Sequence, residues 1–151
     1  MNKYPTFRHH GGASGVTGSC HQLDCDADNA LLVDCGLFQG EDANATDSFE
    51  QLQVDFPVST IRALLVTQVH IDHIGRLPYL VAAGYNGPII CTRPSELLLP
   101  LVIDDALRIG FTRDADLIGK FRERIKQQLV AVDYKVWHCV VDTPELRVRV
   151  K

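Results

Sequence analysis

The sequence predicts an α/β domain, a mixed β-sheet with helices packed on one side. Short apolar runs bounded by turn-forming residues occupy the first part of the chain, and the run ALLV at residues 30–33 is the clearest. Strand and helix patterns then alternate between Arg62 and Ile109, as in a βαβ unit. An amphipathic pattern follows from Asp114. The chain has 151 residues, of which 46% are hydrophobic and 23% charged, so it is long enough to bury one core.

The N-terminal part favours strands and loops. We predict strands over residues 6–10, 19–25 and 30–35, and loops over residues 11–15, 26–29 and 36–48. The loop at 26–29, DADN, contains residues typical of tight turns. The loop at 36–48 is polar, and we expect one helical turn after it, near Phe49.

The remaining elements follow from periodicity and from residues that end helices. We predict strands over residues 62–67 and 88–91, and helices over residues 76–83, 93–109 and 114–132. Gly84 is a C-cap for the first helix, and Pro94 is tolerated in the first turn of the second. The segment Leu146–Val150 alternates apolar and basic residues, which is typical of a half-buried strand. No other predicted strand follows or precedes it closely, so we expect its edge to be open for pairing with another chain.

Composition narrows the function classes. The net charge of −4 does not indicate a general nucleic-acid-binding surface, although it allows a local basic groove. The chain has no run of eighteen apolar residues and its start, MNKYP, lacks the apolar core of a signal peptide. We therefore expect a cytoplasmic protein that does not span a membrane.

The five cysteines are scattered and form no Cys-x-x-Cys pair. We interpret them as small buried residues in a reducing compartment. Cys35, beside Asp34, is the best candidate for a reactive or metal-ligating thiol.

The segment TQVHIDHIG at residues 67–75 contains the candidate metal ligands. His70, Asp72 and His73 follow a predicted buried strand, and imidazole and carboxylate groups are the ligands that zinc prefers. Side chains that converge after a strand could hold one metal or two adjacent ones. The alternative is a polar loop that caps a helix beginning near Gly75, with Asp72 at the electropositive helix end.

This segment resembles the His-x-His-x-Asp-His signature of the metallo-β-lactamase fold, with Gln68 in place of the first histidine. The stretches GASGVTGSCH at 12–21 and LVDCGLFQG at 32–40 resemble the opening of the β-CASP branch, whose members include RNA-processing nucleases. The sequence IDHIGRLP at 71–78 fits the same branch. The resemblance covers essentially the whole chain and implies a partial αββα sandwich, its N-terminal half.

The resemblance also implies roles for individual residues. His70 matches a ligand of the first of two zinc ions, and Asp72 and His73 match ligands of the second. Asp34 matches an aspartate that orients the metal-binding loop, and with Asp72 it takes the catalytic position in the family pattern. Gln68 stands at a ligand position, where an amide oxygen is a weak zinc ligand. We therefore expect partial or absent zinc occupancy.

For function, the resemblance implies that residues 1–151 form one truncated domain, without the β-CASP insertion and the C-terminal half. We expect the N-terminal fragment of a zinc-dependent ribonuclease acting on RNA, with negligible activity alone. One alternative is a non-catalytic module that forms homo-oligomers or binds a related chain through Leu146–Val150. Others are a folded remnant without a role, and a metallo-β-lactamase-fold hydrolase of another substrate class.

Overall fold

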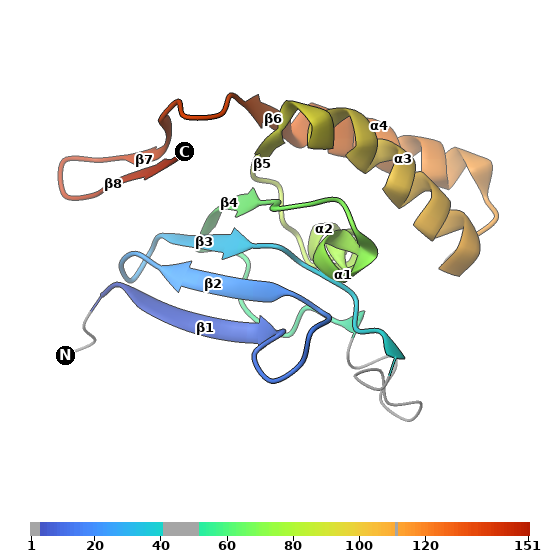
Figure 1. Cartoon of the computed structure of the whole chain (residues 1–151), viewed down its shortest axis with the longest axis horizontal. Coiled ribbons are helices and arrows are strands. Elements are labelled where there is room, and N and C mark those ends of the chain that lie inside the picture. Colours follow the sequence, from blue (N-terminus) through green and yellow to red (C-terminus); the bar gives the residue numbers. More distant parts are fainter. Residues whose placement is uncertain (1–3, 41–51, 111) are drawn as a thin grey trace.

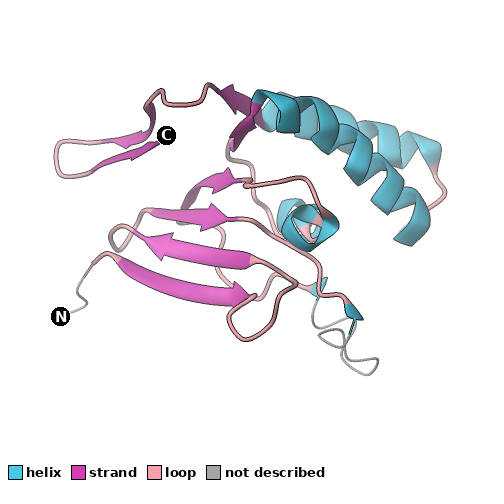
Figure 2. Ribbon diagram, viewed as in Figure 1, coloured by secondary structure: helices cyan, strands magenta, loops and turns pink. Residues whose placement is uncertain are grey.

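The structure, a computed structural model, describes residues 4–40, 52–110 and 112–151. Figures 1 and 2 show a twisted sheet, two long helices beside it and a hairpin at the other end. The strands are β1 (Thr6–Gly11), β2 (Cys20–Asp24), β3 (Ala30–Val33), β4 (Ile61–Leu65), β5 (Ile89–Thr92), β6 (Leu129–Val132), β7 (His138–Asp142) and β8 (Arg147–Val150). The helices are α1 (Ile71–Ile74), α2 (Leu77–Ala82), α3 (Arg93–Gly110) and α4 (Ala115–Gln128).

The main sheet is mixed, as predicted. Among the described residues its strand order is β1-β2-β3-β4-β5-β6. The pairs β1–β2 and β2–β3 are antiparallel, and β3–β4, β4–β5 and β5–β6 are parallel. The predicted turn between β2 and β3 forms because the Asp26 carboxylate accepts hydrogen bonds from the backbone N–H groups of Asp28 and Asn29, at 2.8 Å each. The chain therefore reverses direction with the turn groups satisfied.

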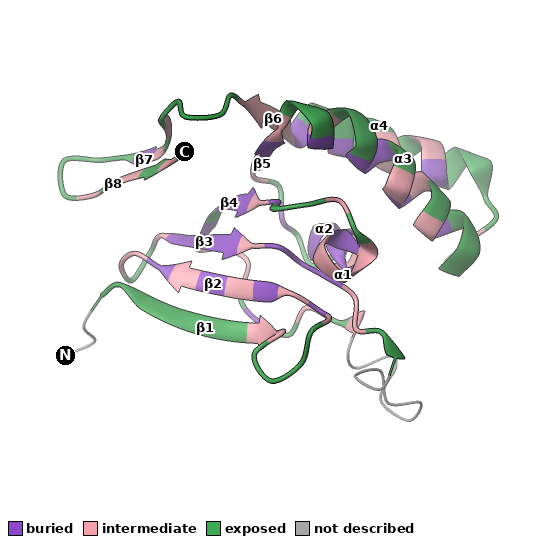
Figure 3. Ribbon diagram, in the orientation of Figure 1, coloured by how far each residue is buried: buried purple, intermediate pink, exposed green. Residues whose placement is uncertain are grey.

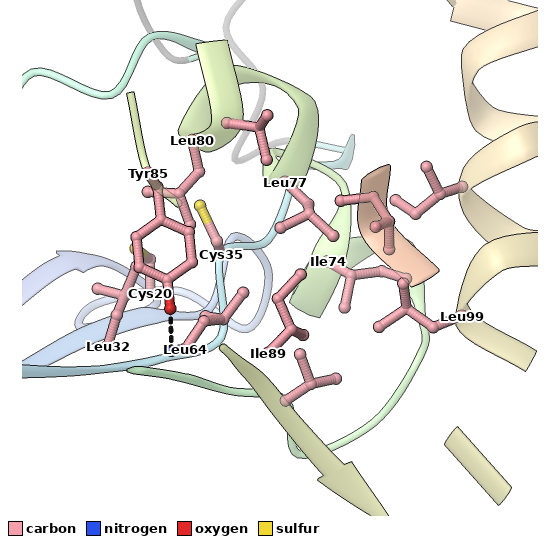
Figure 4. Packing of buried hydrophobic residues seen from close by; sticks show 14 of the residues in the cluster. Cys20, Leu32, Cys35, Leu64, Ile74, Leu77, Leu80, Tyr85, Ile89 and Leu99 are labelled. Atoms are coloured by element: carbon pink, nitrogen blue, oxygen red, sulfur yellow. Dashed lines mark hydrogen bonds between the residues drawn. The ribbon is translucent and has the colours of Figure 1, made fainter. Parts of the chain in front are cut away.

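Alternating residues of the central strands pack on the two faces of the sheet. Leu32, Leu64 and Ile89 belong to the larger core, which the helices cover (Figures 3 and 4). The helical members of that core include Leu77, Leu80, Leu99, Ile103, Ile118 and Ile125. Leu31 and Ile90 face the other way and pack with valines of the β7–β8 hairpin. The run at 30–33 is thus buried on both sides, as its apolar composition predicted.

The prediction of a helix through Val132 is wrong at its C-terminal end. Helix α4 stops at Gln128, and the next four residues form β6, parallel to β5. Leu129 and Val132 are three residues apart, which fits the helical period, whereas in the strand they lie on opposite faces of the sheet, Leu129 toward the helices and Val132 toward the hairpin. Pairing with β5 satisfies the backbone of this segment while Val130 packs on the hairpin side, and this tertiary contact overrides the local pattern.

The expectation that Leu146–Val150 lacks a partner strand is also wrong. Strand β8 pairs with β7 in an antiparallel hairpin, with a bulge near Cys139 and Val141. We did not predict β7 because its sequence, HCVVD, does not alternate regularly. The predicted half-buried pattern of β8 is confirmed, since its valines are partly buried and its arginines exposed.

The predicted helix 76–83 is α2, and the short α1 precedes it. The helical turn expected near Phe49 lies outside the described residues. Among the described helices, no segment is long and apolar enough to cross a membrane.

Candidate functional site

Main-chain hydrogen bonds anchor the segment after β4 to the loop after β3 and to the residue before β2. The backbone N–H of Cys35 donates to the carbonyl of His73 at 2.7 Å, and that of Ser19 donates to the carbonyl of Asp72 at 2.9 Å. Gly36 lies so close that a Cβ atom added there would be 1.6 Å from the carbonyl oxygen of Asp72. A side chain at position 36 is therefore excluded by contact with the candidate metal loop.

Asp34 is the polar centre of this arrangement. Its side chain is buried, and its backbone is left-handed, with φ of 60°. One carboxylate oxygen accepts from the backbone N–H of Thr67 at 2.9 Å. The other accepts from the hydroxyls of Thr67 and Ser19 at 2.8 and 3.1 Å, and from Nδ1 of His73 at 2.7 Å. Such a carboxylate fixes the orientation and tautomer of an imidazole.

Because Asp34 accepts a hydrogen bond from the Nδ1–H group of His73, the Nε2 atom of the neutral ring carries a lone pair. The amide nitrogen of Gln68 lies 2.7 Å from Nε2 and donates to it. The lone pair that could ligate a metal is thus engaged by the residue that departs from the family signature. Gln68 does more than leave a ligand position weak, because it competes for the neighbouring ligand.

Asp72 lies beside His73 at the same end of the loop. Its Oδ2 atom is 3.5 Å from Nε2 of His73. Zinc bonds of about 2.0–2.1 Å in tetrahedral geometry place two ligand atoms roughly 3.3 Å apart. Asp72 and His73 therefore fit as two ligands of one ion. Asp72 also lies in the first turn of α1, but that helix begins at Ile71, and the helix after Gly75, α2, has Arg76 at its N-cap, so the helix-capping alternative is wrong on which residue caps it.

His70 is separate from this pair. It occupies the N-cap position of α1 with an exposed side chain, which forms no capping hydrogen bond. Within the described ranges, no three His, Cys, Asp or Glu side chains converge as a metal site. The structure thus brings together Asp34, Gln68, Asp72 and His73 and leaves His70 outside, so the donor set fits a zinc ion only in part.

Three further histidines lie on the adjoining strands β1 and β2. Nδ1 of His9 is 2.8 Å from Nδ1 of His21, its cross-strand neighbour. His10 stacks on Phe56 and lies 2.9 Å from the Gln22 amide oxygen. Burial lowers the pKa of His10, and burial followed by the charge of His9 lowers the pKa of His21. Sequence reasoning missed these pairings because they depend on strand register.

The cysteine next to Asp34 is not set up as a nucleophile. Cys20 and Cys35 are both fully buried. A hydrogen bond with Cys20, together with burial, raises the pKa of Cys35 well above its usual value. A thiol that stays protonated is neither a good nucleophile nor a good metal ligand.

Comparisons with known proteins agree with this arrangement. Residues 15–132 match the family model described as the metallo-beta-lactamase superfamily. The chain is 42% identical over 102 residues to Ribonuclease TTHA0252 of Thermus thermophilus, covering 66% of this chain and 22% of the relative. It is 36% identical over 128 residues to Transcription termination factor FttA of Methanocaldococcus jannaschii, covering 83% of this chain and 20% of the relative.

A eukaryotic protein is similar over a longer stretch. Endoribonuclease YSH1 of Gibberella zeae is 29% identical over 141 residues, covering 86% of this chain and 16% of the relative. The chain spans about a fifth of the length of the curated relatives it matches.

Proposed function

This chain belongs to the metallo-β-lactamase superfamily, with β-CASP RNA-processing nucleases among its relatives, and from this premise we propose that it supplies the N-terminal, metal-loop part of a zinc-dependent ribonuclease fold. We further propose that the 151 residues do not cleave RNA by themselves. The substrate class of the relatives supports RNA as the polymer concerned.

One contact carries the second half of the proposal. The Gln68 amide donates to Nε2 of His73, and the same ring is held from its other side by Asp34. A metal could reach Nε2 only after Gln68 moves away. The loop then offers His73, Asp72 and, after rearrangement, His70, which is too few for a closed site with strong affinity.

Zinc at this loop would polarise a phosphodiester and lower the pKa of a bound water. The protein groups have distinct tasks beside it. His73 and Asp72 would hold the ion, and Asp34 would keep the His73 ring in the required tautomer.

The test is zinc content and RNA cleavage of chelator-free protein and of the Gln68→His variant. We expect the natural sequence to bind clearly less than one zinc per chain and to show negligible cleavage. Restoring the histidine should raise zinc content, because it removes the competing amide and adds a strong ligand. Gln127→His, on the exposed side of α4, is the matched control and should change nothing.

Two results would overturn the proposal. One is robust, chelator-sensitive RNA cleavage by the protein with Gln68 intact. The other is equal zinc content in the natural sequence and the Gln68→His variant, since the Gln68–His73 contact would then not oppose metal binding.

A second function rests on the hairpin. Among the described strands, β8 pairs with β7 alone, so the backbone of its other edge offers hydrogen-bonding groups to a further strand. We propose association with a second copy or a related chain through this strand, Leu146–Val150. Light scattering over a range of protein concentrations tests it, and a monodisperse monomer throughout would rule out self-association.

The state of the cysteines bears on the cellular compartment of the protein. All five cysteines are free thiols, and three of them, Cys20, Cys35 and Cys91, are buried. Free thiols are typical of proteins in reducing compartments. We therefore propose a cytoplasmic location.

A further inference from the structure

Two cations of the β7–β8 hairpin converge on one aromatic ring. The Arg149 guanidinium lies 5.1 Å from the ring centroid of Trp137, and the Lys151 ammonium lies 5.4 Å from it. Both distances are within the range of cation–π attraction. The ring is 55% exposed, and Tyr134, three residues earlier, is 72% exposed. Cations and aromatic faces are therefore presented together to solvent.

The two cations differ from nearby arginines in whether a carboxylate is paired with them. Arg147 is paired with Asp142 at 2.8 Å, and Arg93 with Asp133 at 2.7 Å. Over the described part of the chain, no carboxylate forms an ion pair with Arg149 or Lys151. Two positive charges without a paired carboxylate thus lie near one ring, and both attract an anion that binds beside it.

A cavity reaches from Lys151 to the strand ends of the main sheet. It has a volume of about 230 Å³ and a largely apolar lining, in which Lys151, Tyr134 and Asp133 are found together with Thr92 and Val66. Val66 directly precedes Thr67, the first residue of the candidate metal loop. Ligands of α/β sheets bind outside the carboxyl ends of parallel strands, and the cavity lies at the ends of β4, β5 and β6.

We propose that Trp137, Arg149 and Lys151 form a binding site for the phosphodiester backbone of single-stranded RNA. The cations contact the phosphates, and Trp137 and Tyr134 offer faces on which bases stack. The choice of RNA rests on the proposed function, whereas the site itself rests on the hairpin geometry.

The experiment uses a labelled single-stranded oligouridylate and fluorescence anisotropy at several salt concentrations, in the presence of a chelator. The chelator separates RNA binding from the metal proposal, so either can fail alone. The variants are Arg149→Gln and Lys151→Gln, with Arg113→Gln as a matched control on an exposed loop. Trp137 is the single tryptophan, so its intrinsic fluorescence reports binding at the site.

We expect RNA to quench Trp137 fluorescence and Arg149→Gln to weaken binding while Arg113→Gln does not. Loss of one phosphate contact should reduce the slope of log affinity against log salt by about 0.7. Trp137→Ala should weaken binding about five-fold or more, since stacking on the ring is lost, and Trp137→Phe should retain part of the affinity.

Three results would overturn the inference. The first is no binding at low salt, and the second is equal weakening by Arg149→Gln and Arg113→Gln, which indicates diffuse attraction. The third is a polyglutamate peptide that binds as tightly as RNA with the same dependence on Arg149, because the site would then recognise acidic protein. Thermal unfolding of each variant checks that these exposed substitutions leave the fold intact.

Discussion

Nδ1 of His73 lies 2.7 Å from Oδ2 of Asp34, although 39 residues separate them in the sequence. This contact joins the segment after β3 to the segment after β4. The aspartate is buried and left-handed, and each of its oxygens has a hydrogen-bond donor. The position of His73 is thus set by the fold of the β3–β4 connection as well as by its own loop.

Replacing Asp34 by alanine should therefore destabilise the protein. The change leaves the Thr67 and Ser19 hydroxyls and the His73 ring without their acceptor, and hydrogen bonds to a charged group are worth about 1.5–3 kcal/mol each. We expect a loss of about 3 kcal/mol or more in the free energy of unfolding, measured with urea. Asp105→Ala, on the exposed side of α3, should stay within about 0.5 kcal/mol, and equal effects would contradict the role of Asp34.

Two glycine-to-alanine substitutions should have opposite signs. At Gly36 the added Cβ collides with the Asp72 carbonyl, and overpacking of this kind costs about 1–3 kcal/mol or more. At Gly119, inside α4, the added Cβ meets no atom within 4 Å. Alanine there should stabilise the helix by about 0.5–1 kcal/mol. Thermal unfolding of the two variants tests these opposite changes in stability. A Gly36→Ala variant with unchanged stability would show that the metal loop is not held so close to position 36.

Removal of the Tyr85 hydroxyl should cost about 1 kcal/mol. That hydroxyl accepts from the backbone N–H of Leu64 at 2.8 Å (Figure 4). It donates to the carbonyl of Pro88 at 2.7 Å, so it links β4 to the start of β5. Burial also raises the pKa of this phenol above its usual value. We propose comparing Tyr85→Phe with Tyr134→Phe by urea unfolding. The exposed Tyr134 should tolerate the change, and similar losses for both would refute the structural role.

Acidification should destabilise the protein through the half-buried His10. Burial lowers its pKa below the ordinary 6.5, and nearby Arg8 and Arg76 add to this, while Gln22 and Asp55 act in the opposite direction. The unfolded chain then binds a proton more readily than the folded one. The stabilising contribution of neutral His10 is complete above pH 6.5 and is lost as the pH falls below it.

The measurement is the free energy of unfolding of the natural sequence and of His10→Gln between about pH 7.5 and about pH 5. We expect the natural protein to lose more stability over this interval than the variant, which has no proton to bind at this position. If both lose the same amount, His10 does not contribute, and the acid sensitivity belongs to other groups such as His21, whose pKa is also lowered.

Patterns that depend on one segment could be predicted from the sequence. The run at 30–33 is a central strand, as its apolar composition predicted. Partners that depend on register or on distant segments could not be predicted. The strand at 129–132 continues a helical pattern, and only its pairing with β5 makes it extended.

In the candidate site, too, some features could be predicted from the sequence and others could not. The sequence identified Gln68 as an exception among metal-ligand positions, because its amide is a weak ligand. It did not indicate that this amide donates to His73, since that contact depends on how the loop turns between β4 and α1. The roles of the His70, Asp72 and His73 side chains toward a metal stay predictions until zinc content is measured.

The direct passage from α4 into β6 constrains how this region can change. Gln128 is the last helical residue and Leu129 the first of the strand, and the N–H of Leu129 still donates to the carbonyl of Ile125. With no spacer, a single inserted residue cannot be absorbed in a loop. It would turn the valines of β6 from the hairpin toward the helices, because side chains alternate along a strand. Natural and engineered length variation should therefore avoid this junction and collect at the turns, such as that between β7 and β8.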